Sequence, residues 1–256
     1  MTTGTGTGRS VTVELDAEVA VVTLRRPTKL NAISSAMERD LRSVLDAPEV
    51  TGSRAVVITG GELVSSAGAD LDEIGGRSPA EVLAYYRATG GVYEAVADLP
   101  QPSVSAIAGY CLGGGLELAL ATDFRIATDD AILGFPEVGI GIIPSSGGLL
   151  RLVRSVGTAR ARELVIARPR IDATTAASAG LLTEVVPAGT SPLPRALGLA
   201  KQLAALPPLA VELAGRAIDA ASESSREAAL LVERLCYAAL AGDARSPGAK
   251  PPHAGR

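Results

Sequence analysis

GYCLGGGLELALA, residues 109–121, places three consecutive glycines, Gly113–Gly115, directly before an apolar run that predicts a buried helix. Glycines at such a turn let the backbone approach a ligand closely and present its N–H groups. The N-terminus of the following helix adds partial positive charge, which suits a developing oxyanion. Tight packing of a strand against a helix, or a flexible turn, would use the same glycines, so these interpretations stay open.

Glu117 lies in the first turn of this predicted helix, among leucines and alanines. It is either a partner of the helix dipole or a buried acid that points into a cleft. No Gly-Lys-Ser/Thr follows the glycines, which excludes a phosphate loop, and their spacing is not that of a dinucleotide site.

Two other segments carry candidate groups. Glu137 is the one ionisable residue of GFPEVGIGIIPSSGG, residues 134–148, and an acid among apolar residues tends to have a raised pKa. SSAGADLDE, residues 65–73, contains a small-residue turn that can present the N–H of Ala69. A solvent-facing turn and a plain loop are the alternatives for these two segments.

The surrounding sequence alternates strands and helices. Val11–Asp16 and Val19–Arg25 predict a hairpin, and Arg54–Thr59 and Ser103–Ala108 predict strands buried on both faces. Short strands are also predicted at Phe124–Ala127, Ala131–Leu133 and Thr183–Val186. The predicted helices are Ser34 or Ser35 to Leu45, Pro79–Asp98, Gly147–Val156, Ala159–Ala167, and then Pro194–Ala205, Pro208–Ala221 and Arg226–Ala241.

This order predicts an α/β core over residues 11–190 and a helical C-terminal region over residues 191–241, with disordered tails at 1–10 and 242–256. Helices without a sheet of their own commonly pack on another subunit, which predicts a homo-oligomer.

Composition excludes several classes of function. A net charge of −4 opposes nucleic-acid binding, and the arginines between Arg151 and Arg170 are expected on a solvated helix face. The first ten residues lack the apolar core of a secretion signal, no apolar run reaches membrane-spanning length, and the two cysteines predict neither disulfide nor metal site, so a cytoplasmic location is expected. The single histidine, His253, excludes Ser-His-Asp and Cys-His catalysis and most zinc sites.

Taken together, four motifs resemble the enoyl-CoA hydratase/isomerase (crotonase) superfamily from about Val11 to Pro187. They are RPTKLNA (residues 26–32), AGADL (67–71), GYCLGGGLELA (109–119) and FPEVGIGIIPSSGG (135–148), in the family's order. The resemblance implies a crotonase-like spiral of repeated ββα units with a C-terminal helical extension that forms trimers. It further implies a homotrimer or dimer of trimers that acts on an acyl-CoA thioester, with coenzyme A as part of the substrate and no separate cofactor or metal.

By motif position, the resemblance assigns an oxyanion hole to the N–H groups of Ala69 and Gly114. Glu117 would activate water, and Glu137 would deliver a proton to the α-carbon. The coenzyme A nucleotide would lie near Lys29, Leu30, Ala67, Asp70 and Leu71. The two glutamates favour an enoyl-CoA hydratase of fatty-acid or related acyl-CoA degradation, which adds water syn across the 2,3 double bond.

The alternatives are an enoyl-CoA isomerase or other crotonase-type reaction, and a non-catalytic acyl-CoA-binding protein. Three departures from the family's usual pattern keep them open: IPSSGGLL (143–150), ARPRI (167–171) and a C-terminus without the usual Phe and Lys-Arg pair, for which Lys250 is a weak substitute. A related fold occurs in Clp-type serine peptidases, but these need a histidine.

Overall fold

The computed structural model describes residues 10–74, 78–89, 91–168 and 170–243. The chain divides after Ala205 into two compact units, which are described separately. The expected disordered tails fall almost wholly outside the described residues, as does Lys250.

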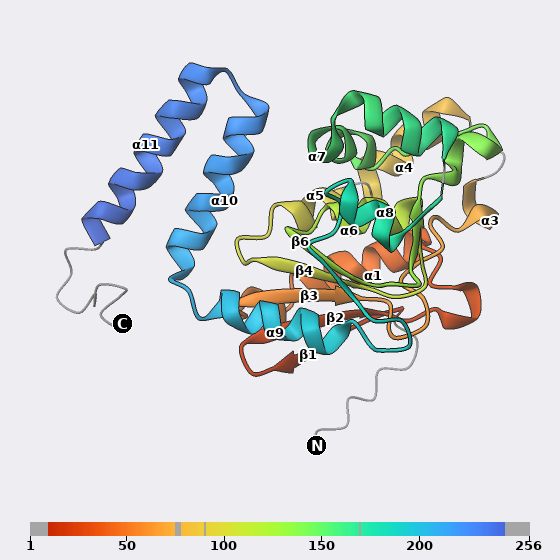
Figure 1. Ribbon diagram of the computed structural model, residues 1–256, viewed down its shortest axis with the longest axis horizontal. Helices are drawn as coiled ribbons and strands as arrows, with labels where there is room; N and C mark the ends of the chain where they lie inside the picture. The colour runs from red at the N-terminus through yellow and green to blue at the C-terminus, as the bar shows by residue number, and fades with distance from the viewer. Residues whose placement is uncertain (1–9, 75–77, 90, 169, 244–256) are drawn as a thin grey trace. The chain divides into compact units, whose positions relative to one another are not determined.

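A six-stranded sheet forms the centre of the first unit (Figure 1). Its first two strands make the predicted antiparallel hairpin, and the other neighbouring strands pair in parallel. In spatial order the strands are β1 (Val11–Asp16), β2 (Val19–Leu24), β3 (Ala55–Thr59), β4 (Ser103–Ile107), β6 (Phe124–Thr128) and β9 (Glu184–Val186).

Both faces of this sheet are covered. In β3, Val56 and Ile58 belong to one core cluster with α1 (Ser35–Leu45) and α5 (Gly91–Ala97), while Ala55 and Val57 belong to another. The alternation follows from the two-residue period of a strand, and it explains why β3 is apolar throughout. The prediction of strands buried on both faces is confirmed for β3 and β4.

Helix α9 (Leu193–Ala204) covers the second face. Ala196, Ala200 and Ala204 are spaced by four residues, lie on one side of the helix and are buried against the strands. The first of the three predicted C-terminal helices therefore belongs to the first unit.

A second, three-stranded sheet leads to the glycine run. It consists of β5 (Tyr110–Leu112), β7 (Ile132–Gly134) and β8 (Ile171–Asp172), and a single residue separates β5 from α6 (Gly114–Leu120). The core around Phe135 and Leu152 joins this sheet to α6 and α7 (Gly148–Arg162).

Two predicted helical regions involve a glycine. The region predicted as helix Pro79–Asp98 contains α4 (Pro79–Thr89) and α5, with Gly90 outside the described residues. The helices predicted before and after Gly157 meet at a kink within α7, where Gly157 has a non-helical φ of 75°, in agreement with two helical segments. A π-helical turn, η3 (Glu163–Ala167), follows α7.

The remaining described elements are short: α2 (Pro48–Thr51), α3 (Leu71–Ile74), α8 (Ala173–Ser178), η1 (Pro27–Lys29) and η2 (Pro136–Ile140). Ser34 caps α1 by accepting a hydrogen bond from the N–H of Met37.

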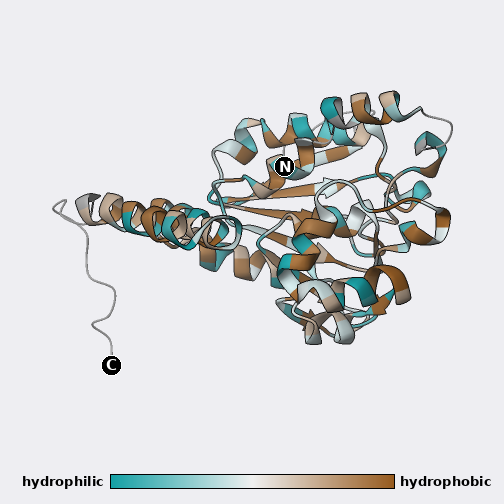
Figure 2. Cartoon of the chain, turned by 90° about the horizontal axis from the view of Figure 1, so that it is seen from above, coloured by the Kyte–Doolittle hydropathy of each residue, from teal (hydrophilic) through white to brown (hydrophobic). Residues whose placement is uncertain are grey.

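The second unit contains α10 (Pro208–Glu223) and α11 (Arg226–Asp243), which contact each other. No residue of α10 is buried, and hydrophobic residues recur along both helices (Figure 2). The large exposed ones are Leu209, Ile218, Leu231, Leu235 and Tyr237. None of the helices in the described part of the chain is long and apolar enough to cross a membrane.

Candidate active site

The turn at Gly113 brings two distant segments against α6. Its φ of 50° and ψ of −125° lie in a region open to glycine alone. A Cβ at Gly113 would lie 2.7 Å from Glu137 Oε1 and 3.7 Å from the Cα of Gly68. At Gly115, a Cβ would lie 2.7 Å from the Cβ of Ser66. Gly113 and Gly115 therefore allow close packing of the backbone. The same close packing brings the segments that carry the candidate residues next to α6.

The N–H groups of Ala69 and Gly114 are neighbours. A Cβ at Gly114 would lie 3.5 Å from the nitrogen of Ala69. Ile33 pairs with Gly68 O and Asp70 N, at 2.8 Å each, which leaves the Ala69 N–H on the other side of its strand-like segment. Within the described residues, neither N–H has a hydrogen-bond acceptor. Both amides are therefore available to an oxygen atom of a ligand.

Glu117 is a buried carboxyl group held by a second turn. Its side chain is buried, and Oε1 accepts hydrogen bonds from the N–H groups of Ser146 (2.7 Å) and Gly148 (3.0 Å). Burial raises the pKa of Glu117, whereas these amides and the positive charge of Arg151 act in the opposite direction. The geometry favours the buried-acid interpretation, because the carboxylate is aimed at the turn between η2 and α7.

Glu137 lies beside Glu117 in a different environment. It belongs to η2 and is buried, and its Oε2 has no hydrogen-bond partner among the described residues. Burial, with a smaller effect of the negative charge of Glu117, raises the pKa of Glu137 to about 7. Glu137 therefore carries a proton much more readily than an exposed glutamate does. The solvent-facing alternative for this residue is wrong.

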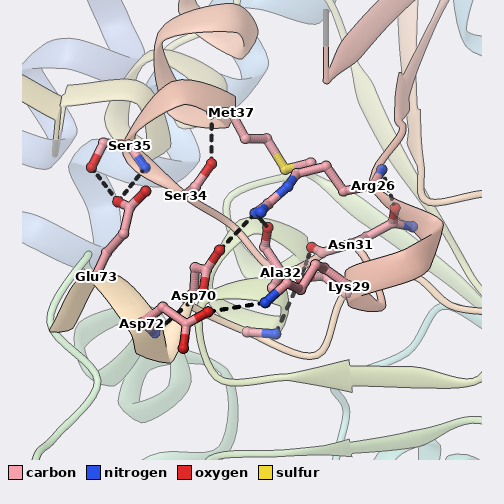
Figure 3. Close-up of polar contacts among 12 residues, drawn as sticks. Arg26, Lys29, Asn31, Ala32, Ser34, Ser35, Met37, Asp70, Asp72 and Glu73 are labelled. Atoms are coloured by element: carbon pink, nitrogen blue, oxygen red, sulfur yellow. Dashed lines mark hydrogen bonds and ion pairs between the residues drawn. The ribbon is translucent and has the colours of Figure 1, made fainter. Parts of the chain in front are cut away.

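Among the residues expected near the nucleotide, Lys29 and Asp70 lie on neighbouring loops (Figure 3). The N–H of Ala67 donates to the carbonyl of Leu30 at 2.9 Å, and the Lys29 and Asp72 side chains form an exposed ion pair at 2.9 Å. The side chains of Leu30 and Leu71 are exposed. Asp70 differs from them, because it is buried and pairs with Arg26 at 2.9 Å. This bond lowers the pKa of Asp70 and ties the two loops together.

Asn31 holds these loops to the segment that follows the central strand β3. It has a φ of 52° and is buried, and its Nδ2 donates to the carbonyls of Gly60 (2.8 Å) and Val64 (2.9 Å). Its Oδ1 accepts from the N–H of Arg26 at 2.8 Å. Asparagine tolerates the left-handed conformation better than most residues, so it suits both requirements.

Sequence reasoning missed two contributors to the site. The first is the pair of amides from Ser146 and Gly148, for which the double glycine Gly147-Gly148 is the available signal: a Cβ at Gly148 would lie 2.4 Å from Glu117 Cγ. The second is Arg151, expected on a solvated face. Its side chain is only 13% exposed and pairs with Glu94 at 2.9 Å.

Two tyrosines differ in their relation to this cluster. Tyr93 is buried, and its hydroxyl lies 3.2 Å from the position of a Cβ at Gly114, whereas Tyr85 donates a hydrogen bond to Glu38 at 2.8 Å. Across the described residues, no group of three or more His, Cys, Asp or Glu side chains could hold a metal ion.

Comparisons with known proteins agree with this architecture. The sequence model of the enoyl-CoA hydratase/isomerase family matches residues 14–245. The chain is 36% identical to the 2,3-dehydroadipyl-CoA hydratase of Escherichia coli, over 90% of this chain and 89% of the relative.

Solved structures show the same fold. The enoyl-CoA hydratase of Bacillus anthracis superposes with a TM-score of 0.84 at 35% identity, covering 91% of this chain and 92% of that one. The enoyl-CoA hydratase of Thermoplasma volcanium gives a TM-score of 0.83 at 30% identity, covering 95% and 98%. The expected crotonase-like α/β fold is confirmed, and the chain is a member of the enoyl-CoA hydratase/isomerase family.

Proposed function

We propose that this protein hydrates the 2,3 double bond of a 2-enoyl-CoA thioester. The observation that carries the proposal is the pair of buried carboxyl groups, Glu117 and Glu137, beside the two available amides of Ala69 and Gly114. Water addition needs one group that accepts a proton from water and another that supplies a proton to carbon. The different environments of the two glutamates suit these two tasks.

The thioester carbonyl would accept hydrogen bonds from the N–H groups of Ala69 and Gly114. As water attacks C3, negative charge moves onto this oxygen, and each such donor stabilises it by about 3–4 kcal/mol in comparable sites. Glu117 accepts the proton of the attacking water, and Glu137 delivers its proton to C2 on the same face. The product is a 3-hydroxyacyl thioester, and proton exchange between the two carboxyl groups restores the starting state.

Coenzyme A would enter as part of the substrate. The exposed side chains of Lys29, Leu30 and Leu71 surround the loop that continues into Ala69, which supports a nucleotide position there. Ala67 and Asp70 would shape this loop, Asp70 through its bond to Arg26.

Purified protein is expected to hydrate crotonyl-CoA or a longer 2-enoyl-CoA. The reaction is measured by the loss of absorbance of the conjugated double bond. Because Glu137 acts in its protonated form, kcat should fall as the pH rises through about 7. Migration of the double bond without hydration would favour the isomerase. Thioester binding in a calorimeter without turnover at any chain length would favour the non-catalytic binding protein.

We further propose a cytoplasmic homotrimer or dimer of trimers. The exposed apolar residues of α10 and α11 support self-association, because such surfaces are commonly covered in assemblies. Sedimentation equilibrium is expected to give three or six times the chain mass of 25.9 kDa. A single species of one chain mass would contradict the assembly, and Leu231→Lys should weaken it.

A further inference from the structure

Arg151 reaches the candidate site from behind the turn that holds Glu117. Its Nη2 lies 2.9 Å from Glu94 Oε1, and its Nη1 donates to the carbonyl of Ser146 at 3.2 Å. This places one guanidinium group between α5 and the turn before α7. The arginine side chain is only 13% exposed, which shields its contact with the Ser146 carbonyl, whereas Glu94 is 59% exposed and holds the guanidinium from the solvent side.

The backbone connects this contact directly to Glu117. The Ser146 carbonyl belongs to the peptide unit between Ser146 and Gly147. The two amides that donate to Glu117 Oε1, those of Ser146 and Gly148, belong to the peptide units on either side of it. The central unit connects the two donors, so the bond from Arg151 to its carbonyl anchors the turn from which both amides point.

Gly147 makes this arrangement possible. It has a φ of 88°, and a Cβ there would lie 2.3 Å from Arg151 Nη1 and 2.9 Å from Glu94 Oε1. The absence of a side chain at Gly147 therefore lets the ion pair lie directly against the turn.

We propose that Arg151, clamped by Glu94, is a positioning residue that orients the Ser146 and Gly148 amides and so keeps Glu117 ionised and aimed at the water. The role in hydration rests on the proposed function. Arg151 touches neither water nor thioester in this role, and it acts through the turn and through its charge.

The other charged groups around α6 are few among the described residues. The negative charge of Glu117 acts on Glu137 in η2 and raises its pKa, and Glu94 in α5 is connected to the site through Arg151. Arg125 bonds to the carbonyl of Ala119, at the other end of the helix. Arg151 is thus the positive charge that acts on Glu117.

The test compares Arg151→Gln, Arg151→Lys and Glu94→Gln with a control, Arg160→Gln. Arg160 lies on α7 too, but it pairs with Glu163 at an exposed position. We expect Arg151→Gln to lower kcat about 10- to 100-fold with KM nearly unchanged, as for other groups that orient a reacting residue. The acidic limb of its pH–kcat profile should move to higher pH, because Glu117 is harder to ionise without the cation.

The conservative variants separate orientation from charge. Arg151→Lys retains the charge without the planar fork and should restore kcat in part. Glu94→Gln leaves Arg151 charged but unclamped and should also lower kcat, whereas Arg160→Gln should match the wild type. Unchanged kcat in both Arg151→Gln and Glu94→Gln, with native circular dichroism, would overturn the proposal.

A titration that does not depend on turnover separates this inference from the proposed function. The ¹³C signal of the Glu117 carboxyl, assigned with Glu117→Gln, should titrate at higher pH in folded Arg151→Gln than in the wild type. If Arg151→Gln does not fold, the same comparison is made with Arg151→Met, which also removes the charge. No change in that titration would overturn the role of Arg151 even if hydration is observed. A change in it without hydration by the wild type would instead refute the proposed function.

Discussion

Glu137→Gln is expected to lower kcat for enoyl-CoA hydration by about a thousandfold, because general acid catalysis by a positioned side chain contributes about 10²–10⁴. Glutamine has nearly the same shape as a protonated glutamic acid but cannot release a proton to carbon. Binding of a saturated acyl-CoA, measured by calorimetry, should therefore change little. Glu49→Gln, at an exposed position in α2, is the matched control. Equal turnover of Glu137→Gln and wild type would refute the assigned role.

The same variant has an effect on stability with a definite sign. The pKa of Glu137 in the folded protein is about 7, above its ordinary value of 4.5. Its protonated form is therefore favoured by folding, and that contribution is fully present below pH 4.5 and is lost as the pH rises through 7. The stability of Glu137→Gln relative to the wild type should therefore increase between pH 4.5 and about 7 and stay constant above that range, as measured by urea unfolding.

Gly113→Ala is expected to abolish measurable hydration and to lower the free energy of unfolding by about 2–3 kcal/mol, the usual range for strain at such a backbone conformation. The added methyl group would meet Glu137 Oε1 at 2.7 Å while the backbone has a φ of 50°. Neither the glutamate nor the turn can keep its position. Urea unfolding and crotonyl-CoA turnover measure the two effects.

Gly139→Ala is the control for this substitution. Gly139 lies in η2, close in sequence to Glu137, but no atom lies within 4 Å of a Cβ at that position. We expect stability and turnover close to those of the wild type. Similar losses in both variants would mean that the effect at Gly113 is not specific to the turn.

The sequence predicted those elements of the fold whose residues are apolar along one continuous segment. The apolar runs at β3 and β4 and the short apolar run after the glycines appear as buried elements because an uninterrupted apolar run indicates burial on every side. The two-residue strand β8 and the three-residue strand β5 are too short to show any period. Their pairing depends on contacts between distant segments, which composition does not encode.

The candidate site could be predicted only in part for the same reason. Glu117 and Glu137 stand out as lone acids in apolar surroundings, and the structure brings them together. Arg151 was expected in solvent because its helical spacing matches that of exposed arginines. Its actual environment depends on Glu94 in α5. The sequence did not predict α5 as a separate helix, because it predicted one helix over Pro79–Asp98.

The charge of Glu117 links its own ionisation to the acidity of Glu137. That negative charge raises the pKa of Glu137, although burial raises it more. Neutralising Glu117 therefore makes its neighbour the stronger acid. The alkaline limb of the pH–rate profile, which Glu137 sets, should then move to lower pH.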